Sequence, residues 1–73
     1  MNRQTITSPE LSAVGYDPAH EILEVEFKNG AVYQFEQVPE YEFTAMLKAP
    51  LPAKYFNTYI RNDYEYKRVE MED

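Results

Sequence analysis

Apolar and polar residues alternate along two neighbouring segments of this chain, residues 23–27 and residues 31–35. In each segment every second side chain is apolar, which is the period of a β-strand with one buried face. The dipeptide Asn29-Gly30 lies between the segments and is typical of a tight hairpin turn. The pattern therefore predicts a β-hairpin whose apolar positions are Leu23, Val25, Phe27, Ala31, Tyr33 and Phe35.

The length of the hairpin loop decides which face these side chains share. A two-residue loop would place Phe27 opposite Val32, so the apolar rows of the two strands would lie on opposite faces. A three-residue loop over 28–30 places Phe27 opposite Ala31 and needs Gly30 in the left-handed conformation as a bulge residue. We expect the three-residue loop, because it brings all the apolar residues to one face. Its further pairs are Val25 with Tyr33 and Leu23 with Phe35.

Another strand is predicted ahead of the hairpin, over residues 11–16. Gly15 within it indicates a bend or a close approach of another part of the protein. Asp17 and Pro18 then occupy the first two positions of a type I turn, where the aspartate side chain accepts a backbone N–H and proline presets φ. We expect a meander of three antiparallel strands.

The register of this first hairpin has two alternatives. A four-residue loop pairs Val14 with Leu23 on the core face. A five-residue loop instead brings Ala13 to that face, opposite Val25. We favour the first alternative because it buries the larger side chain.

The spacing of apolar residues changes after residue 37 from that of a strand to that of a helix. Pro39 suits the first helical position, and Glu40 and Glu42 follow where negative charge stabilises the positive end of the helix dipole. Together with an apolar stripe, these features predict a helix over about 39–49. The stripe consists of Phe43, Met46 and Leu47.

Two prolines separate this helix from a second one. Pro50 ends the first helix, and Pro52 suits the first turn of the next. Phe56 and Ile60 lie one helical turn apart after Pro52, so the second helix is expected near 52–62. Strands followed by helices predict an α+β fold: a three-stranded antiparallel β-meander covered on one face by two short helices.

The ends of the chain carry weaker patterns. Residues 1–9 are expected to form a flexible arm that adds at most a short extended edge near Ile6. Residues 64–69 alternate as a strand or an extended strap would, and residues 70–73 form an acidic tail. We therefore expect one domain over residues 10–69.

Composition narrows the class of protein. The 73 residues contain no cysteine, so neither a disulfide nor a cysteine zinc site is expected to stabilise the core. No segment is long and apolar enough for a signal peptide or a membrane span, which predicts a soluble, cytoplasmic protein. The net charge of −6 opposes non-specific binding to nucleic acid or anionic lipid.

The chain offers few groups for catalysis. His20, the one histidine, falls in a predicted turn, and the two glycines lie too far apart for a phosphate-binding loop. Glu24 and Glu26 share one strand face with His20 and Glu21 nearby, but we interpret them as solvated charges rather than metal ligands. We therefore expect no enzyme, no catalytic residue, no metal and no cofactor.

Aromatic and basic residues interleave between Lys54 and Arg68, a segment with four basic and two acidic residues. Proteins that bind single-stranded nucleic acid use such mixtures, because rings stack on bases and cations follow phosphates. The structural alternative is that these tyrosines complete the core and hold the C-terminal strand. The candidate nucleic-acid contacts are Lys54, Tyr55, Arg61, Tyr64, Tyr66, Lys67 and Arg68.

The chain resembles the KTSC domain family, named for a domain at the C-terminus of some bacterial lysyl-tRNA synthetases and also found as free-standing small proteins. The resemblance covers about residues 8–69 and rests on Gly15-Tyr16-Asp17, Leu23, Val25, Phe27, Gly30, Tyr33, Phe35, Val38-Pro39, Tyr55-Phe56, Ile60-Arg61, Tyr64 and Tyr66. Two departures are Tyr33-Gln34-Phe35 in place of Tyr-x-Tyr and Leu51-Pro52-Ala53 in place of a Ser-Lys-Gly type of helix entry.

Two functions follow as expectations. The resemblance implies a non-enzymatic binding module that contacts RNA, either tRNA or single strands, through the basic and aromatic C-terminal face. The alternative is an accessory protein that binds a protein partner through an exposed strand edge or an acidic sheet face. That acidic face would consist of Glu24, Glu26 and Glu36.

Overall fold

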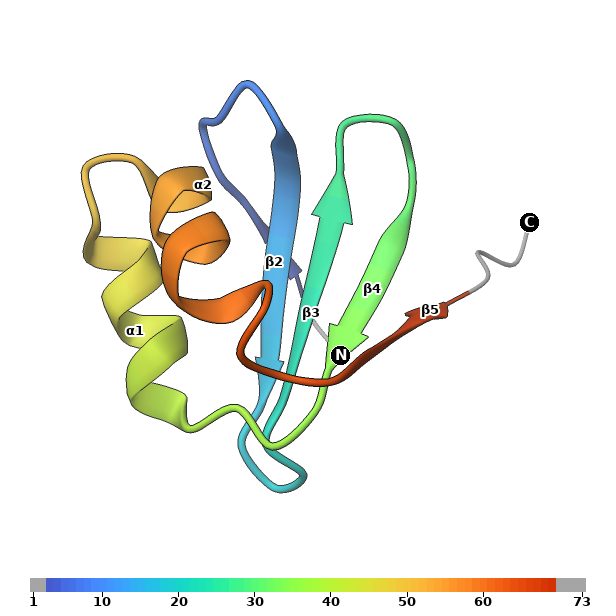
Figure 1. The fold of residues 1–73 in the computed structure, drawn as a ribbon. Coiled ribbons are helices and arrows are strands. Elements are labelled where there is room, and N and C mark those ends of the chain that lie inside the picture. Colours follow the sequence, from blue (N-terminus) through green and yellow to red (C-terminus); the bar gives the residue numbers. More distant parts are fainter. Residues whose placement is uncertain (1–2, 70–73) are drawn as a thin grey trace.

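The computed structural model describes residues 3–69, which form a five-stranded antiparallel sheet with one helical layer (Figure 1). The strands lie in chain order across the sheet, and both helices pack on the same face. This confirms the α+β class and corrects the number of strands from three to five. The elements are β1 Arg3–Thr5, β2 Leu11–Asp17, β3 Ile22–Phe27, β4 Val32–Phe35, α1 Glu40–Lys48, α2 Pro52–Tyr55, the π-helical turn η1 Phe56–Ile60, and β5 Tyr66–Val69.

The two additional strands form the edges of the sheet. β1 pairs with β2 in the part of the chain where we expected an arm, and β5 pairs with β4. Most side chains of both strands are exposed, so no buried apolar row marks them in the sequence. Their backbone groups instead satisfy the N–H and C=O groups along the edges of the meander. The acidic tail expected at 70–73 lies outside the described residues.

The hairpin of β3 and β4 has the expected three-residue loop. Leu23 pairs with Phe35 and Val25 with Tyr33. The Phe27 N–H donates to the carbonyl oxygen of Ala31 at 2.8 Å. Gly30 has a φ of +93°, in the left-handed region that favours glycine. The prediction for this register is confirmed.

The first hairpin differs from both expected registers, because Val14 pairs with Val25. The loop has four residues, but it covers 18–21 rather than 17–20. Glu21 adopts a φ of +54°, which a strand residue does not, and its carbonyl oxygen accepts the Val38 N–H at 2.9 Å. Shifting the loop by one residue moves the partner of each β2 residue by two positions along β3. Because side chains alternate between faces with a period of two, Val14 still faces the core.

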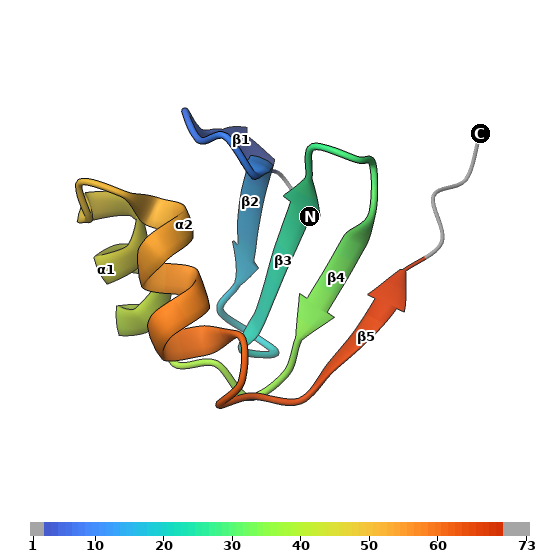
Figure 2. The same ribbon diagram turned by 45° about the horizontal axis from the view of Figure 1, so that its top comes forward.

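The helices occupy the expected ranges, and the second is half π-helical. In η1 the Arg61 N–H donates to the carbonyl oxygen of Phe56, five residues back, at 2.9 Å. The helical layer lies over the β2 side of the sheet and leaves the helix-side surface of β5 uncovered (Figure 2). The core between the two layers consists of Leu11, Val14, Leu23, Val25, Phe35, Val38, Met46, Ala53, Phe56 and Ile60. Within residues 3–69, no helix is both long and apolar enough to cross a membrane.

Candidate functional site

The helix-side surface of β5 carries two of the seven candidate residues. Tyr66 pairs with Phe35 and Arg68 pairs with Tyr33, and directly opposed residues of two strands share a face. Lys67 lies between them and therefore on the other face, where it pairs with Gln34. The pleat of the strand thus divides three consecutive candidates between two surfaces.

Aromatic rings extend from β3 across to β5 on the helix side. Tyr33 meets Phe27 edge to face, with ring centroids 5.5 Å apart, and meets Tyr66 in the same way at 5.3 Å. The Tyr66 ring also lies 5.2 Å from that of Phe35. Tyr66 nevertheless stays 56% exposed, because no helix covers β5. The Tyr66 ring is therefore held in position by its aromatic neighbours while part of its surface stays accessible to solvent.

Arg61 joins this group from the end of the π-helical turn. Its guanidinium lies over the Phe27 ring, 5.9 Å from the centroid, and its Nη1 donates to Oδ1 of Asn57 at 3.1 Å. Arg61 and the four aromatic residues line a hollow of about 50 Å³. We call Phe27, Tyr33, Tyr66, Arg61 and Arg68 the aromatic surface.

Tyr55 and Tyr64, also candidates, converge on Glu42 instead. The Tyr55 hydroxyl donates to Oε1 of Glu42 at 2.5 Å, and the Tyr64 hydroxyl donates to Oε2 at 3.0 Å. The hydrogen bond to Glu42 and burial raise the pKa of Tyr55 to about 12, and burial and the bond to Glu42 do the same for Tyr64. These hydroxyls join the segments after α1 to the first turn of α1.

Glu42 is a buried residue that we had assigned only to the helix dipole. It is 8% exposed. Its position one turn before Met46, on the apolar side of the predicted helix, is the sequence signal that could have revealed this role. Buried carboxylates need hydrogen-bond partners, and the tyrosines supply them.

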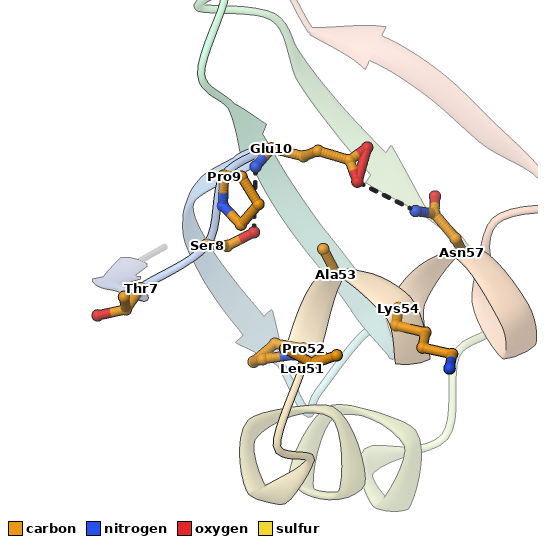
Figure 3. A pocket seen from close by; sticks show the side chains of 9 residues that line it. All are labelled: Thr7, Ser8, Pro9, Glu10, Leu51, Pro52, Ala53, Lys54 and Asn57. Carbon is orange, nitrogen blue, oxygen red and sulfur yellow. Dashed lines mark hydrogen bonds between the residues drawn. The ribbon is translucent and has the colours of Figure 1, made fainter.

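Lys54 lies on α2 beside a groove between the β1–β2 loop and the second helix (Figure 3). We call this the α2 groove. Residues 7–10, residues 51–54 and Asn57 line it, and its volume is about 340 Å³. Glu10 reaches across one end, where its Oε1 accepts a hydrogen bond of 3.5 Å from Nδ2 of Asn57.

The opposite sheet face is not the solvated acidic surface we expected. Arg3 on β1 lies 3.2 Å from Glu24 and 3.4 Å from Glu26, and Gln34 donates to Glu24 at 2.8 Å. Glu24 is only 8% exposed. The interpretation as a solvated charge is wrong for Glu24, because β1 places a guanidinium beside it, whereas Glu26 pairs with the same arginine and stays partly exposed.

His20 lies in the exposed β2–β3 loop. Its Nδ1 is 2.8 Å from Oδ2 of Asp17, and this hydrogen bond is the main reason why the pKa of Asp17 is lowered. Asp17 also accepts the Ala19 N–H at 3.0 Å, as expected for the turn. In the part of the chain that the structure describes, no three His, Cys, Asp or Glu side chains gather as metal ligands would.

Comparison with known proteins gives one consistent result. The family model of the KTSC domain matches residues 7–70. An uncharacterized protein from Stutzerimonas stutzeri is 39% identical over 71 residues, which are 96% of this chain and all of that protein. A segment covering 10% of a lysine–tRNA ligase from Nostoc sp. is 27% identical to 81% of this chain. The crystal structure of a KTSC domain protein from Yersinia pestis has a TM-score of 0.89 and 27% identity, covering 94% of this chain and 97% of that one.

Proposed function

This chain belongs to the KTSC domain family, and from that premise we propose that it is a non-enzymatic module that binds single-stranded RNA on the aromatic surface. The exposed ring of Tyr66, fixed at 5.3 Å from Tyr33 and on the same face as Arg68, carries this proposal. An exposed ring stacks on any base, and a nearby guanidinium contacts the adjoining phosphate.

The non-enzymatic part of the proposal is supported by what the titratable groups already do. Glu42 accepts hydrogen bonds from two tyrosines, and Glu24 is paired with Arg3. His20 is exposed and bonded to Asp17 within a turn. These groups hold elements of the fold together, whereas catalysis requires such groups to converge on a pocket.

The distribution of charge sets the expected strength of binding. The net charge is −6, so the whole-protein field repels a polyanion, and only Arg61 and Arg68 belong to the aromatic surface. Stacking must then supply a large share of the affinity, with a small electrostatic share that falls as salt rises. The similarity to a segment of a lysine–tRNA ligase makes tRNA the first natural RNA to test.

The experiment is a fluorescence anisotropy titration of labelled single-stranded RNA and of tRNA, each at low and at physiological salt. The decisive pair of variants is Arg68→Gln and Lys67→Gln, which remove the same charge from neighbouring residues on opposite faces of β5. We expect Arg68→Gln alone to weaken binding and to reduce the slope of log K against log salt by about 0.7, the value for one single-strand phosphate.

Two outcomes would reject this function. Absence of saturable binding at low salt removes RNA as the ligand. Equal effects of Arg68→Gln and Lys67→Gln mean that only net charge matters, which removes the aromatic surface as the site.

A protein partner is the second candidate, and the position of β5 at the edge of the described sheet favours it. An edge strand offers its unpaired backbone groups to an additional strand from another chain. A partner captured on this protein that persists after nuclease treatment supports this candidate, whereas an RNA-bridged partner is released.

A further inference from the structure

The α2 groove lies next to the aromatic surface, and a chain of contacts joins them. Glu10 at one end of the groove bonds to Asn57, and Asn57 accepts a hydrogen bond from Arg61. Arg61 in turn lies over the ring of Phe27. The groove and the aromatic surface therefore meet at Asn57 and Arg61, and one ligand can contact both.

The polar residues of the second helix form a track along this boundary. Lys54 and Asn57 line the same groove and Asn57 bonds to Arg61, so the three side chains follow one side of the second helix. With at most about 1.5 Å of rise per residue, Lys54 and Arg61 are at most about 10 Å apart along the axis. A stacked strand advances about 3.4 Å along its axis per nucleotide, so the track spans about three nucleotides.

The lining of the groove suits a base better than a phosphate. Pro9, Leu51, Pro52 and Ala53 give it mostly apolar walls, and its volume of about 340 Å³ is in the range of small-molecule sites. Glu10 places negative charge at the Asn57 end, which repels a phosphate and accepts hydrogen bonds from a base amine. Lys54 is exposed, and it has no ion pair among residues 3–69.

We propose that the α2 groove is a second subsite of the RNA-binding surface, which takes a base with an exocyclic amine while Lys54 contacts its phosphate. The occupant is a nucleotide of the same strand, a few nucleotides away from the one that stacks on Tyr66. Glu10 is a specificity-determining residue in this arrangement, because only one of its acceptor positions is used by Asn57. This inference rests on the proposed function and adds the length and the base preference of the ligand.

The test compares single-stranded RNA oligomers of about eight nucleotides, within the usual site size, made of cytidine only or uridine only. Both bases are pyrimidines, and cytosine carries the exocyclic amine that uracil lacks. We expect wild-type protein to prefer the cytidine oligomer by about fivefold, and Glu10→Gln to remove most of this preference without changing the salt dependence.

Lys54→Gln tests the phosphate contact. We expect it to weaken binding of both oligomers and to reduce the salt slope by about 0.7. Lys48→Gln on α1 is the control, since it removes the same charge from an exposed residue that does not line the groove. Thermal melting of each variant checks that these exposed substitutions leave the fold intact.

These measurements distinguish failure of the proposed subsite from failure of the proposed function. If Arg68→Gln weakens binding while Lys54→Gln behaves as Lys48→Gln does, the subsite is wrong and the function stands. A wild-type protein that binds cytidine and uridine oligomers equally also rejects the subsite. Absence of RNA binding by the wild-type protein rejects both proposals.

Discussion

The guanidinium of Arg3 lies 3.2 Å from the carboxylate of Glu24, although a whole strand separates the two strands that carry them. Arg3 pairs with Gly15 of β2, and Gly15 pairs with Glu24 of β3, so the three residues form one row across the sheet. Because glycine has no side chain, the arginine can cross β2 at this point. The close approach expected at Gly15 is thereby explained.

The first prediction concerns this row. Gly15→Ala places a methyl group in the path of Arg3 and should lower the free energy of unfolding by about 1–3 kcal/mol, the usual cost of overpacking. In the background of Arg3→Gln the same substitution should cost much less, since the side chain that needs the space is shortened. Urea denaturation of the four proteins in this cycle gives the coupling. Additivity within about 0.5 kcal/mol would show that Arg3 and Gly15 do not interact.

Glu42→Gln tests the buried carboxylate. The pKa of Tyr55 and of Tyr64 should fall from about 12 toward 10, because the group that accepts their hydrogen bonds loses its charge. Phenolate absorbance during an alkaline titration measures this directly. Glu40→Gln is the matched control: it lies in the same first turn, so it changes the helix dipole interaction equally without touching either tyrosine. Equal titration curves for both variants would remove Glu42 from this role.

Stability should also depend on pH through these two tyrosines. Their pKa is higher in the folded protein than the unfolded value of 10.0, so the unfolded chain loses protons first as the pH rises. Their contribution is fully present below about pH 10 and is lost as the pH approaches about 12. Denaturation midpoints measured across this window should fall, and they should fall less in Tyr55→Phe and Tyr64→Phe. A midpoint that is flat in wild-type protein over the same window would contradict the assignment.

Gly30 provides a purely conformational test. Its φ is +93°, and nothing lies within 4 Å of the position that a Cβ would occupy. Gly30→Ala should therefore cost about 1 kcal/mol through backbone strain alone, and Gly30→Asn should cost less because asparagine tolerates positive φ. Urea midpoints with an unchanged m-value measure both. A Gly30→Ala protein as stable as the wild type would reject the bulged loop.

Tyr66→Ala tests stacking on the aromatic surface. Loss of one base–ring contact costs about 1–3 kcal/mol, so RNA affinity should fall by about fivefold to 150-fold. Tyr41→Ala is the matched control, because Tyr41 is also a largely exposed tyrosine, at 68%, but lies on α1. Tyr66→Phe should retain the affinity, since it retains the ring. An equal loss in Tyr66→Ala and Tyr41→Ala would reject the aromatic surface.

Periodicity predicted the central hairpin and both helices because those elements bury one face. The edge strands were predicted less firmly, β5 as a strand or a strap and β1 as an arm with at most a short extended edge, since their side chains are exposed and backbone pairing with distant residues stabilises them. The same limit applies to Glu42, whose partners lie 13 and 22 residues away. Residues separated by so many positions along the chain produce no periodic pattern within a short stretch of sequence.

The sequence predicted which residues form the candidate site better than it predicted how they are arranged on the surface. The interleaved segment contains Tyr66, Arg61 and Arg68, which lie on one face. Residues 64–69 were predicted as either a strand or a strap. Only a strand forces neighbouring side chains onto opposite faces, so the prediction did not determine that Lys67 lies on the face opposite to Tyr66 and Arg68. Phe27 and Tyr33 were expected in the core, and they extend it to the surface because the helices stop short of β5.

The π-helical turn sets the direction in which Arg61 leaves the second helix. It contains one residue more than a regular α-helical path between Phe56 and Arg61 would need. Deleting a single residue from this turn would make the backbone more regular and yet rotate everything after it by about 100° around the axis. The guanidinium would then leave the Phe27 ring, so the placement of this cation depends on an irregularity that a smoother helix would erase.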